Sequence, residues 1–115
     1  MKRKFINTTT FDRHWSDLGL SDDDLRLLQN HLMKNSRVGD IIEGTGGLTK
    51  LRWNLPNTGK SGGIRVLYID FVYQETIILI NCYSKSEKDT LTNKEKSMYK
   101  DFIKEIGKEL RNERT

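Results

Sequence analysis

The spacing of apolar residues changes from a helical to a strand-like period near residue 40. Before that point, apolar side chains recur every three to four residues, as at Phe11, Trp15 and Leu18. Such spacing places apolar side chains on one helix face, whereas short runs rich in β-branched and aromatic residues indicate strands. Those runs occupy residues 40–42, 48–55, 64–73 and 76–84. The chain must therefore combine helices with a sheet.

Two helices are predicted before the change of period. The threonines at 8–10 can cap the first helix, which ends near Gly19. Ser21 begins the second, because Asp24 three residues later completes a capping box. The second helix carries an apolar stripe of Leu25, Leu28, Leu32 and Met33. We expect these two helices to form a hairpin.

The remaining pattern predicts a sheet and a closing helix. A short strand is expected at 4–6, and Gln74-Glu75 separates the last two strands by a hairpin-length connection. Thr92 and Glu95 make a second capping box, which opens a C-terminal helix. The order β-α-α-β-β-β-α predicts an α+β fold, with an N-terminal helical hairpin and a C-terminal helix packed on a small antiparallel sheet.

Length and composition restrict the class of protein. A chain of 115 residues suits one core, so we predict a single domain over 1–115. Cys82 is the only cysteine, which excludes an internal disulfide and favours the cytoplasm. The basic start is not followed by an apolar stretch, and no run is long enough for a membrane span. We therefore expect neither a signal peptide nor a membrane partner.

Basic residues concentrate in the middle of the chain. The net charge of +4 is modest, but no acidic residue lies between Lys50 and Arg65. Because side chains alternate along a strand, Lys50 and Arg52 share one face of theirs. Asn81, Tyr83 and Lys85 likewise share one face of another strand. In a meander these residues converge near one end of the sheet, with Arg65 at the start of the strand between them, which favours a phosphodiester site.

Cleavage of RNA by its own 2′-hydroxyl has three chemical requirements. A base removes the hydroxyl proton, a cation stabilises the extra charge on phosphorus, and an acid protonates the leaving 5′-oxygen. Arginine suits the second role, and a lysine crowded by other cations loses its proton more readily. His14 and His31 are predicted to lie on helices, away from the basic strands. The competing interpretation is a solvated basic face without catalysis.

Other motifs predict structure rather than chemistry. The sequence GKS at 59–61 ends like a phosphate-binding P-loop, but that motif requires glycine where Asn54 stands, and a strand follows instead of a helix. The acidic run 22–24 suits a helix N-terminus, so no metal is assigned. Trp53 is expected on the opposite face of its strand from Lys50 and Arg52, so we predict that it is a core residue. We predict the same for Trp15.

Three motifs carry a resemblance to a known family. They are GTGGLTKLRW at 44–53, GKSGGIRVLY at 59–68 and YSKSEK at 83–88, and the likeness extends to LGLSDDDL at 18–25 and to the closing helix. Together they resemble the HigB-like branch of the RelE/ParE toxins over nearly the whole chain. The resemblance implies the RelE fold and a type II toxin held inactive by a cognate antitoxin in a hetero-oligomer. It also implies ribosome-dependent mRNA cleavage without a metal or organic cofactor.

The resemblance also assigns roles to individual residues. Lys50 and Arg52 match the family's basic pair, and Arg65 matches the arginine of the Gly-Gly-x-Arg strand, which we expect to stabilise the transition state. Phosphate binding and proton transfer are expected from the further matching positions, Lys60, Tyr83, Lys85 and Lys88. The tyrosine that follows the last strand in the best-known RelE pattern is absent, so the general base is not identified.

Three other functions fit the same residues. A gyrase-directed toxin of the ParE branch would not need the basic set for inhibition. A non-catalytic RNA-binding module would use a positive sheet and Tyr83 for charge and stacking alone. A toxin relic would retain only binding to the antitoxin. Because Arg65 is expected at a sheet end and not in the core, Arg65→Ala should abolish toxicity while leaving the fold intact.

Overall fold

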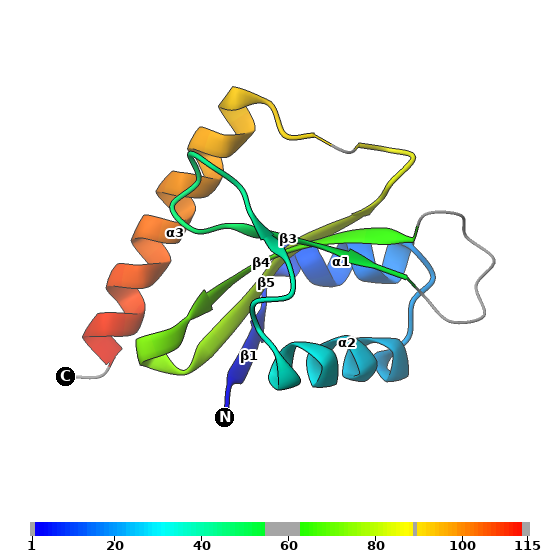
Figure 1. Cartoon of the computed structure of the whole chain (residues 1–115), viewed down its shortest axis with the longest axis horizontal. Coiled ribbons are helices and arrows are strands. Elements are labelled where there is room, and N and C mark those ends of the chain that lie inside the picture. The colour runs from blue at the N-terminus through cyan, green and yellow to red at the C-terminus, as the bar shows by residue number, and fades with distance from the viewer. Residues whose placement is uncertain (1, 55–62, 89, 114–115) are drawn as a thin grey trace.

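The computed structural model describes residues 2–54, 63–88 and 90–113, and these form five strands and three α-helices (Figure 1). A short 3-10 turn at Val72–Gln74 joins β4 to β5. The elements are β1 Lys4–Asn7, α1 Thr9–Asp17, α2 Asp22–Lys34, β2 Asp40–Ile41, β3 Thr49–Trp53, β4 Ile64–Phe71, β5 Thr76–Ser84 and α3 Asn93–Glu113. The predicted α+β class is confirmed, but the described residues form four strands between α2 and α3, one more than the predicted order β-α-α-β-β-β-α contains.

All strands belong to one sheet, in the order β1-β5-β4-β3-β2. The pairs β2–β3, β3–β4 and β4–β5 are antiparallel, as predicted for a meander. The edge strand β1 pairs parallel with β5, from Lys4 opposite Thr76 to Asn7 opposite Leu79, so the sheet is mixed. Most of the chain lies between β1 and β5, so no tight turn joins these two strands. A tight turn would require them to be antiparallel, whereas a long connection allows the parallel pairing.

Hydrogen bonds at the helix starts follow the predicted capping patterns. Thr8 Oγ1 accepts the Phe11 N–H at 3.0 Å at the start of α1. Ser21 and Asp24 form the predicted capping box at the start of α2. At the start of α3, the Glu95 N–H donates to Thr92 Oγ1 at 3.1 Å, and the Thr92 N–H donates to Glu95 Oε1 at 2.9 Å. Local sequence therefore determines where all three helices begin.

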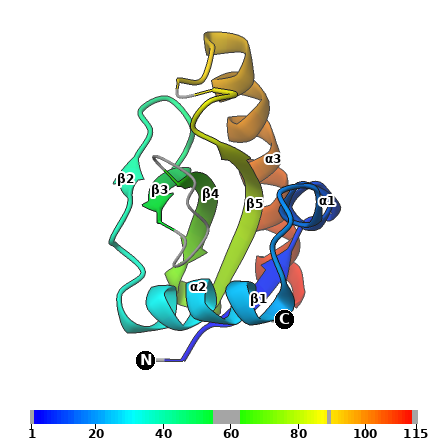
Figure 2. The ribbon, with the colours of Figure 1, turned by 90° about the vertical axis from the view of Figure 1, so that its right-hand side faces the viewer.

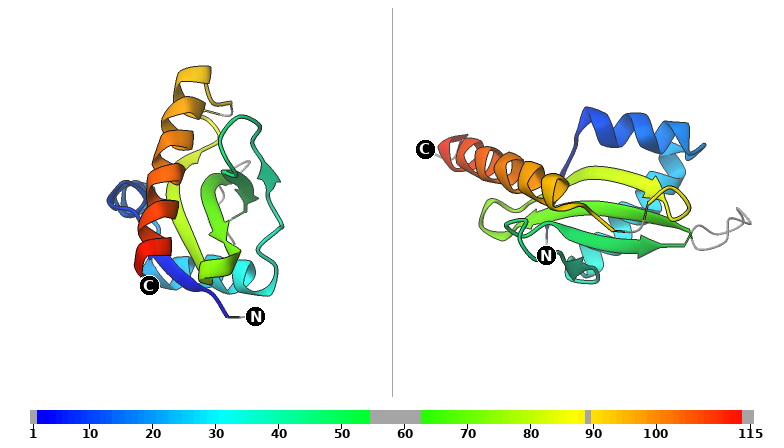
Figure 3. Two further views of the ribbon diagram at one scale, coloured as in Figure 1. Left: turned by 90° about the vertical axis from the view of Figure 1, so that its left-hand side faces the viewer. Right: turned by 90° about the horizontal axis from the view of Figure 1, so that it is seen from above.

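Apolar side chains cover both faces of the sheet. Phe11 and Trp15 of α1, with Leu28 and Leu32 of α2, pack on one face against strand residues that include Val66. The other face is covered by α3, through residues that include Ile103 and Leu110. Figure 2 shows α2 passing beneath the curved strands, and Figure 3 shows α3 running alongside the sheet. We call these the α1/α2 face and the α3 face. None of the described helices is long and apolar enough to cross a membrane.

Candidate functional site

Three of the predicted site residues lie side by side across the central strands. In the strand register Arg52 of β3 is opposite Arg65 of β4, and Arg65 is in turn opposite Tyr83 of β5. We call Arg52, Arg65 and Tyr83 the basic row. Directly opposed residues share a face, and Tyr83 packs in the cluster beneath α3, so the basic row lies on the α3 face.

A neighbouring row contains the next candidate residue. Lys50 is opposite Leu67, and Leu67 is opposite Asn81. Since alternate residues of a strand share a face, Lys50 lies on the same face as Arg52, and Asn81 on the same face as Tyr83. The convergence that the sequence predicted for Lys50, Arg52, Arg65 and Tyr83 is therefore present in the register.

A β-bulge in β5 places Asn81 and Tyr83 on the α3 face. Leu67 pairs with Asn81 while the next residue, Tyr68, pairs with Leu79, so Ile80 is an extra residue. Without it, strict alternation would put Leu79, Asn81 and Tyr83 on one face. Leu79 instead packs on the α1/α2 face. Bulges beside functional sites commonly redirect side chains in this way.

Burial differs sharply within the basic row. Arg65 is 3% exposed and Tyr83 is 7% exposed, whereas Arg52 is exposed and Lys50 is half-buried. The expectation that Arg65 sits outside the core is therefore wrong. Arg65 is only the second residue of β4, but β4 is the central strand of the sheet. Residues of β3 and β5 therefore flank Arg65 on both sides. The register also places two positively charged residues, Arg52 and Arg65, side by side on one face, which suits an anionic ligand.

The other predicted lysines lie beyond the strands. Lys85 is exposed in the turn that follows β5. Lys88 is half-buried and its ammonium group pairs with the Glu95 carboxylate at the start of α3. Lys60 lies outside the described residues. The basic set is thus divided between the sheet and the segment that leads into α3.

The Lys88 contact predicts a measurable effect on Glu95. The hydrogen bond from Lys88, with the Thr92 N–H second, holds the pKa of Glu95 below its ordinary value. A lowered pKa stabilises the fold above the unfolded pKa, and this contribution is lost as pH falls through the folded pKa. Lys88→Ala should therefore raise the Glu95 pKa towards the ordinary value, measured by NMR titration of its carboxyl carbon. An unchanged pKa would exclude the pair in solution, and Lys104→Ala is the control.

Both histidines approach the strands, contrary to expectation. His14 Nδ1 lies 2.6 Å from Asn81 Oδ1 on β5. The ring of His31 packs against Trp53 with centroids 5.0 Å apart. Trp53 is half-buried against the α1/α2 cluster, which confirms its predicted core role. The sequence could not show the His14 contact, because it depends on β1 ending at Asn7 and leaving the edge of β5 open to α1.

Cys82 offers no nucleophile to the site. It lies beside Asn81 and Tyr83 in sequence, but its side chain is fully buried on the α1/α2 face. Burial raises the pKa of its thiol to about 12. Because the thiolate is the reactive form, this cysteine is inert at neutral pH.

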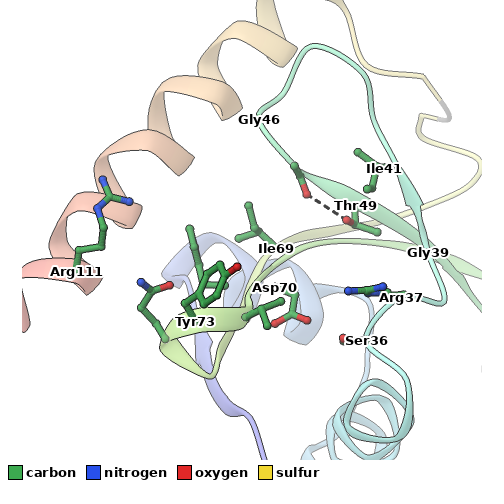
Figure 4. Close-up of a pocket in the computed structure, with 14 residues that line it drawn as sticks. Ser36, Arg37, Gly39, Ile41, Gly46, Thr49, Ile69, Asp70, Tyr73 and Arg111 are labelled. Atoms are coloured by element: carbon green, nitrogen blue, oxygen red, sulfur yellow. Dashed lines mark hydrogen bonds between the residues drawn. The ribbon is translucent and has the colours of Figure 1, made fainter. Parts of the chain in front are cut away.

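A cavity of about 690 Å³ opens at the opposite end of β3 and β4 from the basic row (Figure 4). Apolar residues such as Ile69 line it, and Arg37 and Arg111 stand on two sides of it. Its carboxylate, Asp70, is bonded to Arg3 at 2.8 Å. None of the predicted site residues that the structure describes lines this cavity, and its carboxylate is already paired with an arginine. We therefore place the candidate site at the basic row.

Two comparisons with known proteins bear on the family and on the fold. A family model described as the RelE toxin of the RelE / RelB toxin-antitoxin system matches residues 3–113. Among solved structures, the free state of an E. coli toxin RelE variant with two arginines replaced by alanine is similar to this chain. The TM-score is 0.54 at 13% sequence identity, and the match covers 76% of this chain and 88% of that chain. The structural likeness supports the fold, and the family match covers nearly the whole sequence: the chain belongs to the RelE toxin family.

Proposed function

We propose that this toxin is a ribosome-dependent mRNA endonuclease of the HigB-like branch, which inhibits translation by promoting attack of the RNA 2′-hydroxyl on the adjacent phosphate. The observation that carries the proposal is the direct opposition of Arg52 and Arg65 on neighbouring strands. Two arginines at opposed register positions bring two positive charges to one face of the sheet, and an anionic ligand suits such a face. A phosphodiester supplies the required negative charge.

The chemistry assigns a role to each part of the basic row. Arg65 lies on the central strand between β3 and β5 and is nearly fully buried, and we assign its guanidinium to the charge that develops on phosphorus. Arg52 is exposed and binds the incoming phosphate. Tyr83 and Lys50 flank these arginines on the same face and serve in proton transfer with Lys85, while Lys60 and Lys88 hold the RNA backbone. The products are a 2′,3′-cyclic phosphate and a 5′-hydroxyl, and no metal or organic cofactor takes part.

The cognate partner is an antitoxin protein that masks this surface. An acidic segment suits the basic row for the same reason that a phosphate does. The complex is a hetero-oligomer in the cytoplasm, and release of the antitoxin frees the toxin to enter the ribosome with its mRNA. The ribosome then positions the substrate against the α3 face.

The proposal is tested with purified toxin and a defined mRNA, either free or bound to programmed ribosomes. We expect cleavage within the reading frame on ribosomes, fragments that end in a 2′,3′-cyclic phosphate, and far slower cleavage of the free mRNA. Intact mRNA together with inhibited DNA gyrase supercoiling would contradict the proposal in favour of the ParE-type activity. RNA binding without cleavage under both conditions would contradict it in favour of a binding module.

A further inference from the structure

A chain of hydrogen bonds joins three elements beside the basic row. His14 of α1 and Asn81 of β5 are 2.6 Å apart, from Nδ1 to Oδ1. Asn81 Nδ2 lies 3.1 Å from the hydroxyl oxygen of Tyr99 on α3. Asn81 is the residue that the bulge places on the α3 face, two positions before Tyr83. The chain of hydrogen bonds therefore ends on α3, which covers the face that carries the basic row, and its Asn81 lies two register positions from Tyr83.

The direction of these hydrogen bonds follows from the backbone of Cys82. Its N–H, which can only donate, lies 2.8 Å from Asn81 Oδ1 and so identifies that atom as the amide oxygen. His14 Nδ1 must then carry the hydrogen that it shares with Asn81. The amide nitrogen of Asn81 donates to Tyr99, so the phenol oxygen acts as an acceptor in this contact. The hydrogen of the Tyr99 hydroxyl is left for another acceptor.

Each bond in the chain strengthens the next. An amide whose oxygen accepts two hydrogen bonds is more polarised, and its N–H groups become better donors. A phenol that accepts such a bond is in turn a better donor through its own hydrogen. The chain thus increases the donor strength of one group, the Tyr99 hydroxyl. The Tyr99 ring is partly buried against the α3-face cluster, which limits the directions that the hydroxyl can take.

We infer that Tyr99 donates a hydrogen bond to a phosphate oxygen of the bound RNA, and that His14 and Asn81 are positioning residues which orient and polarise its hydroxyl. This inference rests on the proposed function for the identity of the ligand. It adds to the site a residue from α3, a helix in which sequence analysis assigned no site residue. It also gives His14 a role through Nδ1 alone, without proton transfer to RNA.

Direct binding of a single-stranded RNA oligonucleotide with 2′-O-methyl groups tests the inference without cleavage. Tyr99→Phe should weaken binding by about tenfold, the typical effect of losing one hydrogen bond to a charged group. Tyr73→Phe is the matched control, because Tyr73 lies at the far end of the sheet and is 88% exposed. Equal affinities of these two variants would overturn the inference. Thermal melting of each variant identifies losses that come from unfolding.

Two substitutions of His14 separate positioning from acid–base chemistry. His14→Asn keeps a donor near the place of Nδ1 and should bind RNA nearly as tightly as the unmodified chain, whereas His14→Leu should bind several-fold more weakly. In a Tyr99→Phe background, His14→Leu should cause no further loss, because the two residues act in one chain. A further loss of the same size would overturn the positioning role.

Cleavage on programmed ribosomes distinguishes this inference from the proposed function. If the unmodified chain binds the oligonucleotide with the expected dependence on Tyr99 but does not cleave mRNA, the proposed endonuclease activity fails and the Tyr99 contact stands. If the unmodified chain cleaves mRNA and Tyr99→Phe alters neither binding nor rate, the proposed function stands and the Tyr99 contact fails. If the unmodified chain does not bind RNA at all, both are wrong.

Discussion

Arg65→Lys should lower the single-turnover rate of mRNA cleavage on programmed ribosomes by roughly 100-fold, the usual effect of removing one preorganised donor to a transition-state charge. Lysine keeps the positive charge, but it lacks the planar fork that can contact two phosphate oxygens. Because Arg65 is only 3% exposed, Arg65→Ala would also leave a space in the core and reduce stability. The lysine variant is therefore the better test of the chemistry.

The control for this experiment is a substitution of the same kind at an exposed site. Arg26→Lys changes an arginine on α2 whose side chain is 71% exposed. This variant should cleave mRNA at the same rate as the unmodified toxin. Both variants should unfold at similar temperatures. A fully active Arg65→Lys variant would show that the guanidinium geometry of Arg65 is not required, and the assignment of this residue to transition-state stabilisation would be withdrawn.

Arg3→Met should lower the free energy of unfolding by about 3 kcal/mol, measured by urea denaturation, because it leaves the Asp70 carboxylate without its partner in a nearly buried position. Arg3 Nε and Nη2 lie 2.8 and 3.4 Å from the two oxygens of Asp70. The side chains are 5% and 13% exposed. This pair ties the segment before β1 to β4, across residues that are 67 positions apart in sequence.

Replacing both partners separates the charge from the packing. Arg3→Met combined with Asp70→Leu should recover most of the lost stability, since removing both charges removes the cost of burying either one. Arg26→Met breaks an exposed pair with Asp23 and should change the free energy of unfolding by less than about 0.5 kcal/mol. If Arg3→Met were as mild as Arg26→Met, the Arg3–Asp70 pair would have no structural importance.

The parts of the fold that local sequence determines were predictable. The capping boxes at Ser21 and Thr92 depend on residues three positions apart, and both helices begin where those patterns indicate. The change of hydrophobic period separated helices from strands for the same reason. The parallel pairing of β1 with β5 was not predictable, because it joins segments about 70 residues apart and depends on how the whole sheet assembles.

The faces on which the predicted site residues lie could be predicted from the sequence, but their burial and their contacts with other elements could not. Alternation along single strands grouped Lys50 with Arg52 and Asn81 with Tyr83, because that relation is local. The bulge at Ile80 has no signature in the sequence, yet it decides which helix layer Asn81 and Tyr83 face. The burial of Arg65 and the approach of His14 to β5 depend on how neighbouring elements pack. The residue pattern along a single strand carries no information on that packing.

Induction of the chain in cells tests whether the basic row makes this toxin a ribosome-dependent endonuclease. Primer extension on abundant mRNAs would be run with and without an inhibitor that blocks translation, alongside the Arg65→Lys variant. We expect cuts inside reading frames that disappear when translation is blocked and are strongly reduced in the variant. Growth arrest with intact mRNA, or cuts that persist without translation, would contradict this expectation.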